Sequence, residues 1–334
     1  MKRTRRYRES VWILVLVLLL AVSAMMGLAF GSSRISLIEV LRAAMTGNVK
    51  SSAYRIMVYS RLPRVLGAML CGSALAVAGA ILQAILHNPL ASPNTIGVSN
   101  GAGLLVLACS ALFPSAGHLL PMAAFLGALL TALLVFALAM GSGISNVTLV
   151  LAGVAMSSVL GAGMNCIMML YPDAYIGAST FLVGGLSAVT MNSLRFAAGY
   201  IFLGLLMAML LRREMNIIAL GDATAQSLGM AVGRVRFLLI MTASVLVGAA
   251  VSFAGMVAFV GLIVPHVFRF LIGGDNRYLI PGCALGGAAF VTLCDLAART
   301  LFSPYELPVG ILLSLVGGPF FIYLIISSKR SGHD

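Results

Sequence analysis

The chain has 334 residues, of which 61% are hydrophobic and 9% charged, and its formal net charge is +12 at pH 7. This balance excludes a soluble globular domain and indicates an all-α polytopic membrane protein. A spanning helix needs about 20 mostly apolar residues, so the length allows roughly ten transmembrane helices joined by short loops. The basic residues gather at the ends of apolar runs, as membrane topology favours, and therefore do not indicate nucleic-acid binding.

The apolar runs predict ten helices, and 1–334 is expected to be a single transmembrane domain. The first run follows a basic flank, as in a signal peptide, but its length and the membrane-like remainder predict a retained helix. Ten spans place both termini on one side, which their lysines and arginines predict to be cytoplasmic. The expected helices cover residues 11–30, 63–86, 95–113, 119–140, 145–170, 194–211, 236–256, 258–272, 279–297 and 308–327.

Two polar segments connect these helices. The segment 212–236 carries four arginines and is predicted to be a cytoplasmic loop. The segment from Gly31 to Arg64 then faces outward, although it holds six basic residues and a single acid, Glu39. An outward basic surface attracts an acidic partner, while contact with lipid headgroups or solvent is the alternative. The six basic residues are Arg34, Arg42, Lys50, Arg55, Arg61 and Arg64.

The sequence contains a weak internal repeat. Shifting it by 176 residues lays the stretch from Gly72 over the stretch from Gly248 without a gap. An odd number of expected helices separates the two copies, so they run in opposite directions, as in transporters built from inverted repeats. Residues 60–170 and 236–330 are therefore predicted to be approximate inverted repeats. The identical pairs are Gly72 with Gly248, Ala74 with Ala250, Ala78 with Ala254, Gly79 with Gly255, Leu86 with Leu262 and Pro89 with Pro265.

The stretch NPLASPNTIGVSNGAG, Asn88–Gly103, interrupts two apolar runs with prolines, asparagines and glycines. We expect a helix break here, matched in the second repeat by a break at Pro265. Backbone freed from helical bonding at membrane depth must be buried in protein or face water, so the breaks predict a transport path. Asn88, Asn94 and Asn100 are expected to bond the broken ends. A reverse turn with no transport role is the alternative.

The motifs of an ATP-hydrolysing or metal enzyme are missing, since the chain has neither a G-x-x-x-x-G-K-[ST] loop nor an H-E-x-x-H pair. No catalytic or metal-binding residue is predicted, and the scattered histidines are expected to cap helices or pack. Acidic residues fall in loops or near expected helix ends, which argues against an ion-coupled carrier. Asp295 and Arg299 stand four residues apart and are expected to pair. The cysteines are expected to act as small, buried apolar side chains: Cys71, Cys109, Cys166, Cys283 and Cys294.

Several ordered stretches carry a family resemblance. They are SRLPRVLGAMLCGSALAVAGAILQ, NPLASPNTIGVSNGAG, LAGVAM, FLVGGLS, LGDATAQSLGM, FVGLIVPHVFR and ELPVGILLSLVGGPFFIYLI. Together they make the chain resemble the permease subunits of ABC importers for iron chelates and cobalamin, the FecCD family. The resemblance implies two permease subunits around a central path in the inner membrane of a bacterium. It also implies two cytoplasmic ATPase subunits that bind ATP and Mg²⁺, and an external substrate-binding protein. No cofactor is expected on this chain.

The same resemblance assigns roles to three groups of residues. Outward-facing arginines would meet acidic residues of the binding protein: Arg61, Arg64 and Arg299. A cytoplasmic coupling segment would sit in a cleft of the ATPase: Gly221, Asp222, Ala223, Ala225, Leu228 and Gly229. The turn before LAGVA matches the gate region of the family and holds Asn146 and Val147, while the predicted helix breaks add Asn88, Pro89 and Pro265 to the gate and path. At the gate the family has small hydroxyl residues where this chain has Asn146 and Val147.

The cargo expected from the resemblance is a ferric siderophore, while haem and cobalamin importers share the architecture. The second permease subunit is either a copy of this chain or a related one, and the binding protein is either periplasmic or lipid-anchored. An ion-coupled secondary carrier or a channel is the rival from another class. The paucity of ionisable residues deep in the expected helices argues against the carrier. For the segment 212–236, a solvated connector is the alternative to a coupling role.

Overall fold

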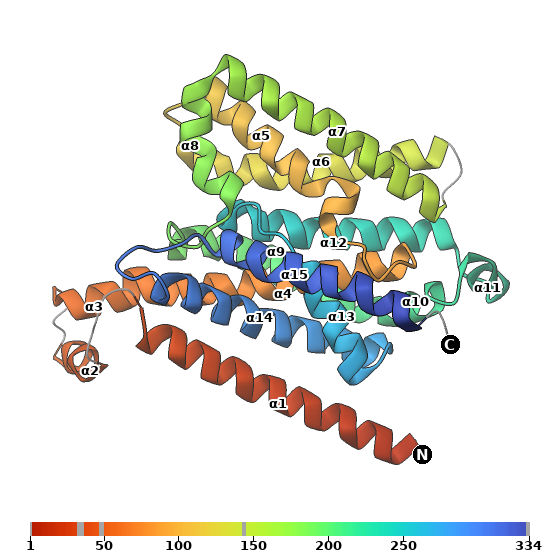
Figure 1. The fold of residues 1–334 in the computed structure, drawn as a ribbon, viewed down its shortest axis with the longest axis horizontal. Coiled ribbons are helices and arrows are strands. Elements are labelled where there is room, and N and C mark those ends of the chain that lie inside the picture. Colours follow the sequence, from red (N-terminus) through yellow and green to blue (C-terminus); the bar gives the residue numbers. More distant parts are fainter. Residues whose placement is uncertain (1, 32–36, 47–49, 142–144, 332–334) are drawn as a thin grey trace.

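The computed structural model describes residues 2–31, 37–46, 50–141 and 145–331, and within these ranges all regular elements are helices. Every expected span has a counterpart (Figure 1). Within these described ranges, seven helices are long and apolar enough to cross a membrane, and three further apolar helices are shorter. About ten spans are thereby confirmed. They are α1 (Lys2–Ala29), α4 (Leu62–Ile85), α5 (Val98–Leu112), α6 (Leu120–Gly141), α7 (Asn146–Leu170), α9 (Met191–Leu210), α12 (Val232–Ala254), α13 (Val260–Ile272), α14 (Asn276–Thr300) and α15 (Val309–Ser331).

Both termini lie at the same end of the bundle, on the right in Figure 1, as the even number of spans requires. We call this the terminal end; it also carries α10 (Arg212–Ile218) and α11 (Asp222–Ser227). The opposite, distal end carries α2 (Leu37–Met45), α3 (Ser52–Ile56) and α8 (Pro172–Val183). Of these five short helices only α11 was expected, because the resemblance matches its segment to the coupling helices of the family. The segment 212–236 is also shorter as a loop than expected, because α12 begins at Val232.

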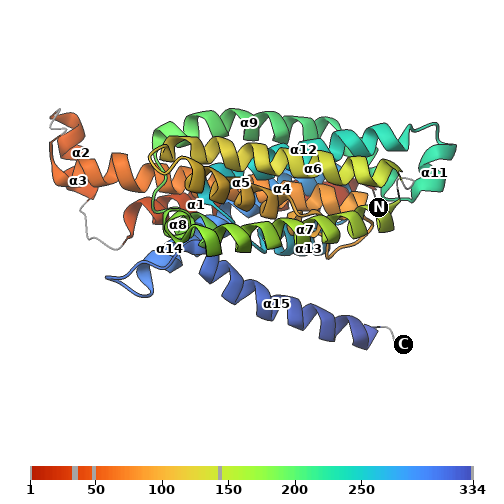
Figure 2. The ribbon, with the colours of Figure 1, turned by 90° about the horizontal axis from the view of Figure 1, so that it is seen from above.

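Helix α4 is the centre of the bundle and is buried along nearly its whole length. Small residues let its neighbours approach closely, which is how membrane helices commonly pack. A Cβ built on Gly72 would lie 2.0 Å from the carbonyl oxygen of Gly287 on α14. Figure 2 shows α15 leaning away from this bundle, so that it packs less than α4 does.

Two helix breaks meet inside the bundle. The first separates α4 from α5 and contains a 3-10 turn, Pro93–Ile96. The second, Gly255–Phe259, separates α12 from α13, and both of its end residues have positive φ, +70° and +67°. A cavity of about 20 Å³ is lined from both sides, by Ser92 to Asn94 and by Val257 to Phe259. The break predicted in Asn88–Gly103 is therefore confirmed, and its partner lies beside it.

The break predicted at Pro265 is wrong. Pro265 is buried inside α13, and the break lies before that helix, at Gly255–Phe259. A proline inside a helix cannot bond the carbonyl four residues earlier, here that of Gly261. The side chain of Gln83 on α4 lies in its place, with Nε2 3.5 Å from the Gly261 oxygen. The helix therefore continues through its proline because a neighbouring helix bonds the carbonyl that the proline leaves open.

The order of elements agrees with an inverted arrangement, because α4 and α12 begin at opposite ends and each leads through a break into a shorter helix (Figure 1). The shift of 176 residues does not align the ends of the two helices. It places Ile85, the end of α4, opposite Gly261 of α13, whereas α12 ends at Ala254. The repeats 60–170 and 236–330 stay a prediction.

The cysteines divide by burial. All five are free; Cys71, Cys283 and Cys294 are buried as predicted, Cys109 is half-buried, and Cys166 is exposed, against the prediction.

Candidate functional sites at the two ends of the bundle

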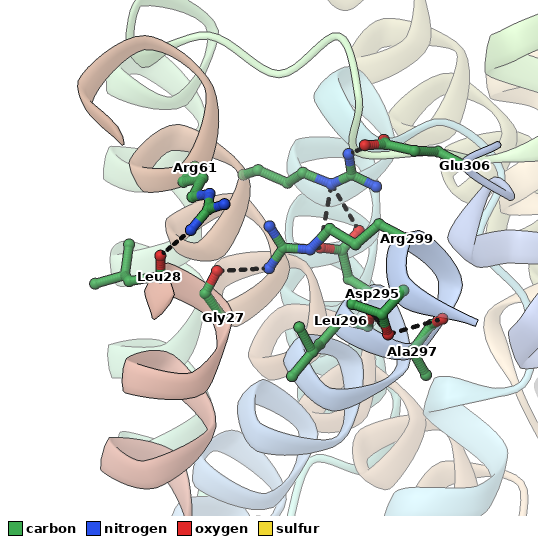
Figure 3. Close-up of polar contacts among 10 residues, drawn as sticks. Gly27, Leu28, Arg61, Asp295, Leu296, Ala297, Arg299 and Glu306 are labelled. Atoms are coloured by element: carbon green, nitrogen blue, oxygen red, sulfur yellow. Dashed lines mark hydrogen bonds and ion pairs between the residues drawn. The ribbon is translucent and has the colours of Figure 1, made fainter. Parts of the chain in front are cut away.

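The distal end holds a cluster of five charged residues, which we call the distal arginine cluster: Arg61, Arg64, Asp295, Arg299 and Glu306. Figure 3 labels Arg61, Asp295, Arg299 and Glu306. Arg64 Nε lies 2.9 Å from Asp295 Oδ1, and Arg64 Nη1 lies 2.5 Å from Glu306 Oε2. On the other side of Asp295, its Oδ2 lies 3.4 Å from Arg299 Nε, which confirms the expected pairing four residues apart. Asp295 thus stands between two guanidiniums from helices α4 and α14.

The cluster also caps the end of α1. Arg61 Nη1 donates to the carbonyl oxygens of Leu28 and Ala29, each at 2.7 Å. Arg299 Nη2 donates to the carbonyl of Gly27, also at 2.7 Å (Figure 3). The last carbonyls of a helix have no partner within it and carry the negative end of its dipole. Two arginines therefore attach α1 to the rest of the bundle.

Arg61, Arg64 and Arg299 lie at the distal end as expected, but they are buried, with exposed fractions of 3%, 7% and 2%. Their donors are taken up by internal carboxylates and carbonyls, so these arginines do not form an exposed basic surface. Docking itself stays a prediction. In the predicted outward segment, the exposed basic side chains are Arg42, Lys50 and Arg55, while Arg34 lies outside the described residues. Sequence reasoning missed Glu306, although it stands within the stretch ELPVG that carries the resemblance.

The terminal end presents α11 as a short projecting helix. Glycines with positive φ flank it, Gly221 at +100° and Gly229 at +81°, a region that other residues seldom adopt. Within α11, Ala225 is buried, while Ala223 is exposed. Leu228 and the neighbouring Leu220, which sequence reasoning missed, are each 63% exposed. A short projecting helix flanked by two exposed leucines fits insertion into an apolar cleft of a partner.

The predicted gate residues are partly gathered at this same end. Asn88 and Pro89 are exposed just after α4, and Asn88 Oδ1 accepts from the Leu90 N–H at 2.9 Å, as expected of a residue that bonds a broken helix end. Asn146 begins α7 and hydrogen-bonds His87, which precedes Asn88. Val147 beside it is exposed. Pro265 is not part of this group, since it lies within α13.

The other two asparagines of the first break differ from expectation. Asn100 Nδ2 donates to the Ser157 carbonyl of α7 at 3.2 Å rather than to a broken helix end. Within the break, the Ser92 N–H donates to Thr95 Oγ1 at 3.1 Å, so the bonding role assigned to Asn94 is taken by these hydroxyl residues.

A side chain from α12 joins the coupling segment to the gate residues. Arg236 Nη2 lies 2.8 Å from Asp222 Oδ1 and also donates to Asn146 Oδ1. The structure therefore brings Asp222 and Asn146 together, although they were assigned to separate groups. Sequence reasoning missed Arg236, which it counted only as one of the loop arginines.

Comparison with known proteins decides the family. The sequence profile of the FecCD transport family matches residues 17–327. The chain belongs to the FecCD transport family. It is therefore a membrane-spanning permease of the ABC transporter type, which is not itself the catalytic subunit.

Individual relatives cover almost the whole chain. It is 37% identical over 333 residues to the Fe(3+)-citrate import system permease protein YfmE of Bacillus subtilis, covering 99% of both proteins. It is 36% identical over 314 residues to the hemin transport system permease protein HmuU of Yersinia pestis, covering 91% of this chain and 94% of that protein. A solved metal-chelate type ABC transporter in an inward-facing conformation matches with a TM-score of 0.83 and 28% identity, covering 94% of this chain and 98% of that one.

Proposed function

We propose that this FecCD permease moves a metal chelate inward across the inner membrane of a bacterium, driven by ATP hydrolysis in partner subunits, and that its cargo is a ferric siderophore. The observation that carries the proposal is α11, a projecting helix flanked by two leucines, Leu220 and Leu228, each 63% exposed, at the end that holds both termini. A permease without an ATP-binding loop needs a surface on which an ATPase subunit can act, and α11 provides such a surface.

The assembly would contain two ABC ATPases, a second permease subunit that is either a copy or a related chain, and an extracytoplasmic substrate-binding protein. ATP and Mg²⁺ belong to the ATPases, and this chain binds no cofactor of its own. We place the terminal end in the cytoplasm, because basic residues flank both termini and follow α9 in Arg212 and Arg213.

The distal arginine cluster supports docking of an acidic binding protein. Its three arginines exceed its two carboxylates, and the exposed Arg42, Lys50 and Arg55 add positive charge at the same end. A carboxylate of the partner would compete with Glu306, whose side chain is 31% exposed, for Arg64. Exposed charges steer the encounter, and buried ones hold the bound state.

The two apposed helix breaks support a transport path between them, since irregular backbone at membrane depth is tolerated only inside protein or beside water. The buried charged residues among those described lie near helix ends, namely Arg61, Arg64, Arg236, Asp295 and Arg299. An ion-coupled carrier places such groups deep in its helices, so this distribution favours ATP as the energy source.

Uptake into proteoliposomes tests the proposal. The chain is reconstituted with its ATPase and binding protein. Accumulation of three radiolabelled substrates, a ferric siderophore, haem and cobalamin, is then measured with ATP supplied inside or outside the vesicles and without ATP. ATP-dependent accumulation of the siderophore alone supports the full proposal. Accumulation of haem or cobalamin instead would change the cargo only. Transport that follows an ion gradient and ignores ATP would overturn it.

A further inference from the structure

A buried guanidinium joins three elements at the terminal end. Arg236, in the first turns of α12, has no exposed surface. Its Nη2 contacts both Asp222, the first residue of α11, and Asn146, the first residue of α7. A single nitrogen thus links the helix assigned to ATPase contact with the helix assigned to the gate.

The hydrogen bonds continue from Asn146 to the first helix break. Asn146 Nδ2 lies against His87 Nδ1, and His87 Nε2 lies 2.5 Å from the carbonyl oxygen of Ile218. A guanidinium can only donate, so the Asn146 oxygen accepts from Arg236 and the Asn146 amide donates to His87. His87 then carries its proton on Nε2 and donates to Ile218. This assignment follows from the network, which admits one amide orientation and one tautomer.

The chain of bonds closes into a ring. Ile218 ends α10 and Asp222 begins α11, so the first and last members lie on either side of the short turn between these helices. His87 has φ of +47°, a left-handed conformation that few residues other than glycine adopt. Such a conformation persists where surrounding contacts fix it, and the two hydrogen bonds of the His87 imidazole, to Asn146 and to Ile218, do so.

We propose that Arg236 is a positioning residue that transmits displacement of α11 to the start of α7 and to the first helix break. The inference rests on the proposed function for the role of α11 as the ATPase contact. When α11 moves, a buried arginine cannot be left without its carboxylate, so Arg236 follows Asp222. Asn146 shares the same nitrogen, and His87 follows Asn146. Both segments that flank the predicted gate are then moved by one residue.

Coupling in the reconstituted complex gives the first test. Asn146→Ala cuts the ring but leaves α11, Asp222 and Arg236 in place. We expect ATP hydrolysis to stay within about twofold of wild type while substrate moved per ATP falls about fivefold or more. Thr148→Ala, two residues further along the same helix and outside the ring, removes a hydroxyl that lies 2.7 Å from Ser145 Oγ; it is the matched control and should change neither quantity. Equal loss of hydrolysis and uptake, or no loss of uptake per ATP, would overturn the proposal.

Hydrogen exchange on the purified full chain in detergent gives the second test, and it does not depend on transport. Asp222→Ala should speed amide exchange about fivefold or more at 145–150 and 86–91, whereas Gln226→Ala on the same short helix should leave both segments unchanged. Unchanged exchange in Asp222→Ala would overturn the relay even in a working importer. Faster exchange in a chain that shows no ATP-driven uptake would support the relay and refute the proposed function.

Discussion

Gly79 of α4 and Gly261 of α13 are in backbone contact, so that a Cβ on Gly79 would lie 1.8 Å from the Gly261 carbonyl oxygen. This is the carbonyl that Pro265 cannot bond and that Gln83 faces. The contact therefore holds the helix after the second break against the helix before the first, and it fixes how the two breaks meet.

We expect Gly79→Ala to push α4 and α13 apart and to destabilise the protein by about 1–3 kcal/mol, because the obstructing atoms are backbone. Gly199 of α9 has no heavy atom within 4 Å of a built Cβ, and Gly199→Ala should be neutral or slightly stabilising. Thermal unfolding of both variants in the same detergent compares them. A Gly79→Ala protein as stable as Gly199→Ala would show that the contact is not tight.

The distal arginine cluster predicts a large effect from one uncharged substitution. Asp295→Asn would leave Arg64 and Arg299 buried without their shared carboxylate, which typically costs about 3–5 kcal/mol. Asp173, an exposed acid at the same end, provides the control, since Asp173→Asn should stay within about 0.5 kcal/mol of wild type. Chemical or thermal unfolding measures the difference. Similar values for both variants would mean that the cluster contributes little.

Docking of the binding protein is expected to depend on the exposed basic residues as well as the buried ones. Arg55→Glu with Lys50→Glu should weaken binding about tenfold at low salt and less at high salt, because exposed charges are screened. Arg213→Glu, exposed at the opposite end, is the control. Binding of the labelled substrate-binding protein to the permease complex at two ionic strengths gives the measurement. Equal weakening by Arg213→Glu would remove the assignment of docking to the distal end.

The exposed leucines of the coupling segment predict loss of the ATPase without loss of folding. Leu228→Asp should abolish co-purification of the ATPase while thermal unfolding of the chain is unchanged, since the side chain is 63% exposed. Leu301→Asp places the same change on a leucine 66% exposed at the distal end and should retain the ATPase. Retention of the ATPase by Leu228→Asp would count against the coupling role of α11.

The ten spans could be predicted to within a few residues because each is a continuous apolar run with polar ends. Helices α2, α3, α8 and α10 could not, since they are short and lack an apolar run of spanning length, and α11 was expected only from the family resemblance. Pro265 misled the prediction because a local sign of a break was compensated by Gln83 on another helix. Local sequence does not contain that compensation.

Burial of the arginines was the main feature of the sites that could not be predicted. Arg64 and Asp295 are 231 residues apart, and an arginine at the end of an apolar run is equally consistent with solvent or lipid headgroups. The same holds for Arg236, whose partners come from α7 and α11. The residue groups at the two ends were predictable from the family resemblance, but their internal bonding required the fold.

Gentle purification of the chain from its native membrane, with identification of what accompanies it and an assay of ATP hydrolysis in the complex, tests the central claim most directly. The account predicts an ABC ATPase in the complex and hydrolysis stimulated by the substrate-binding protein. A chain that purifies without any ATPase and moves a solute in liposomes under an ion gradient would contradict it.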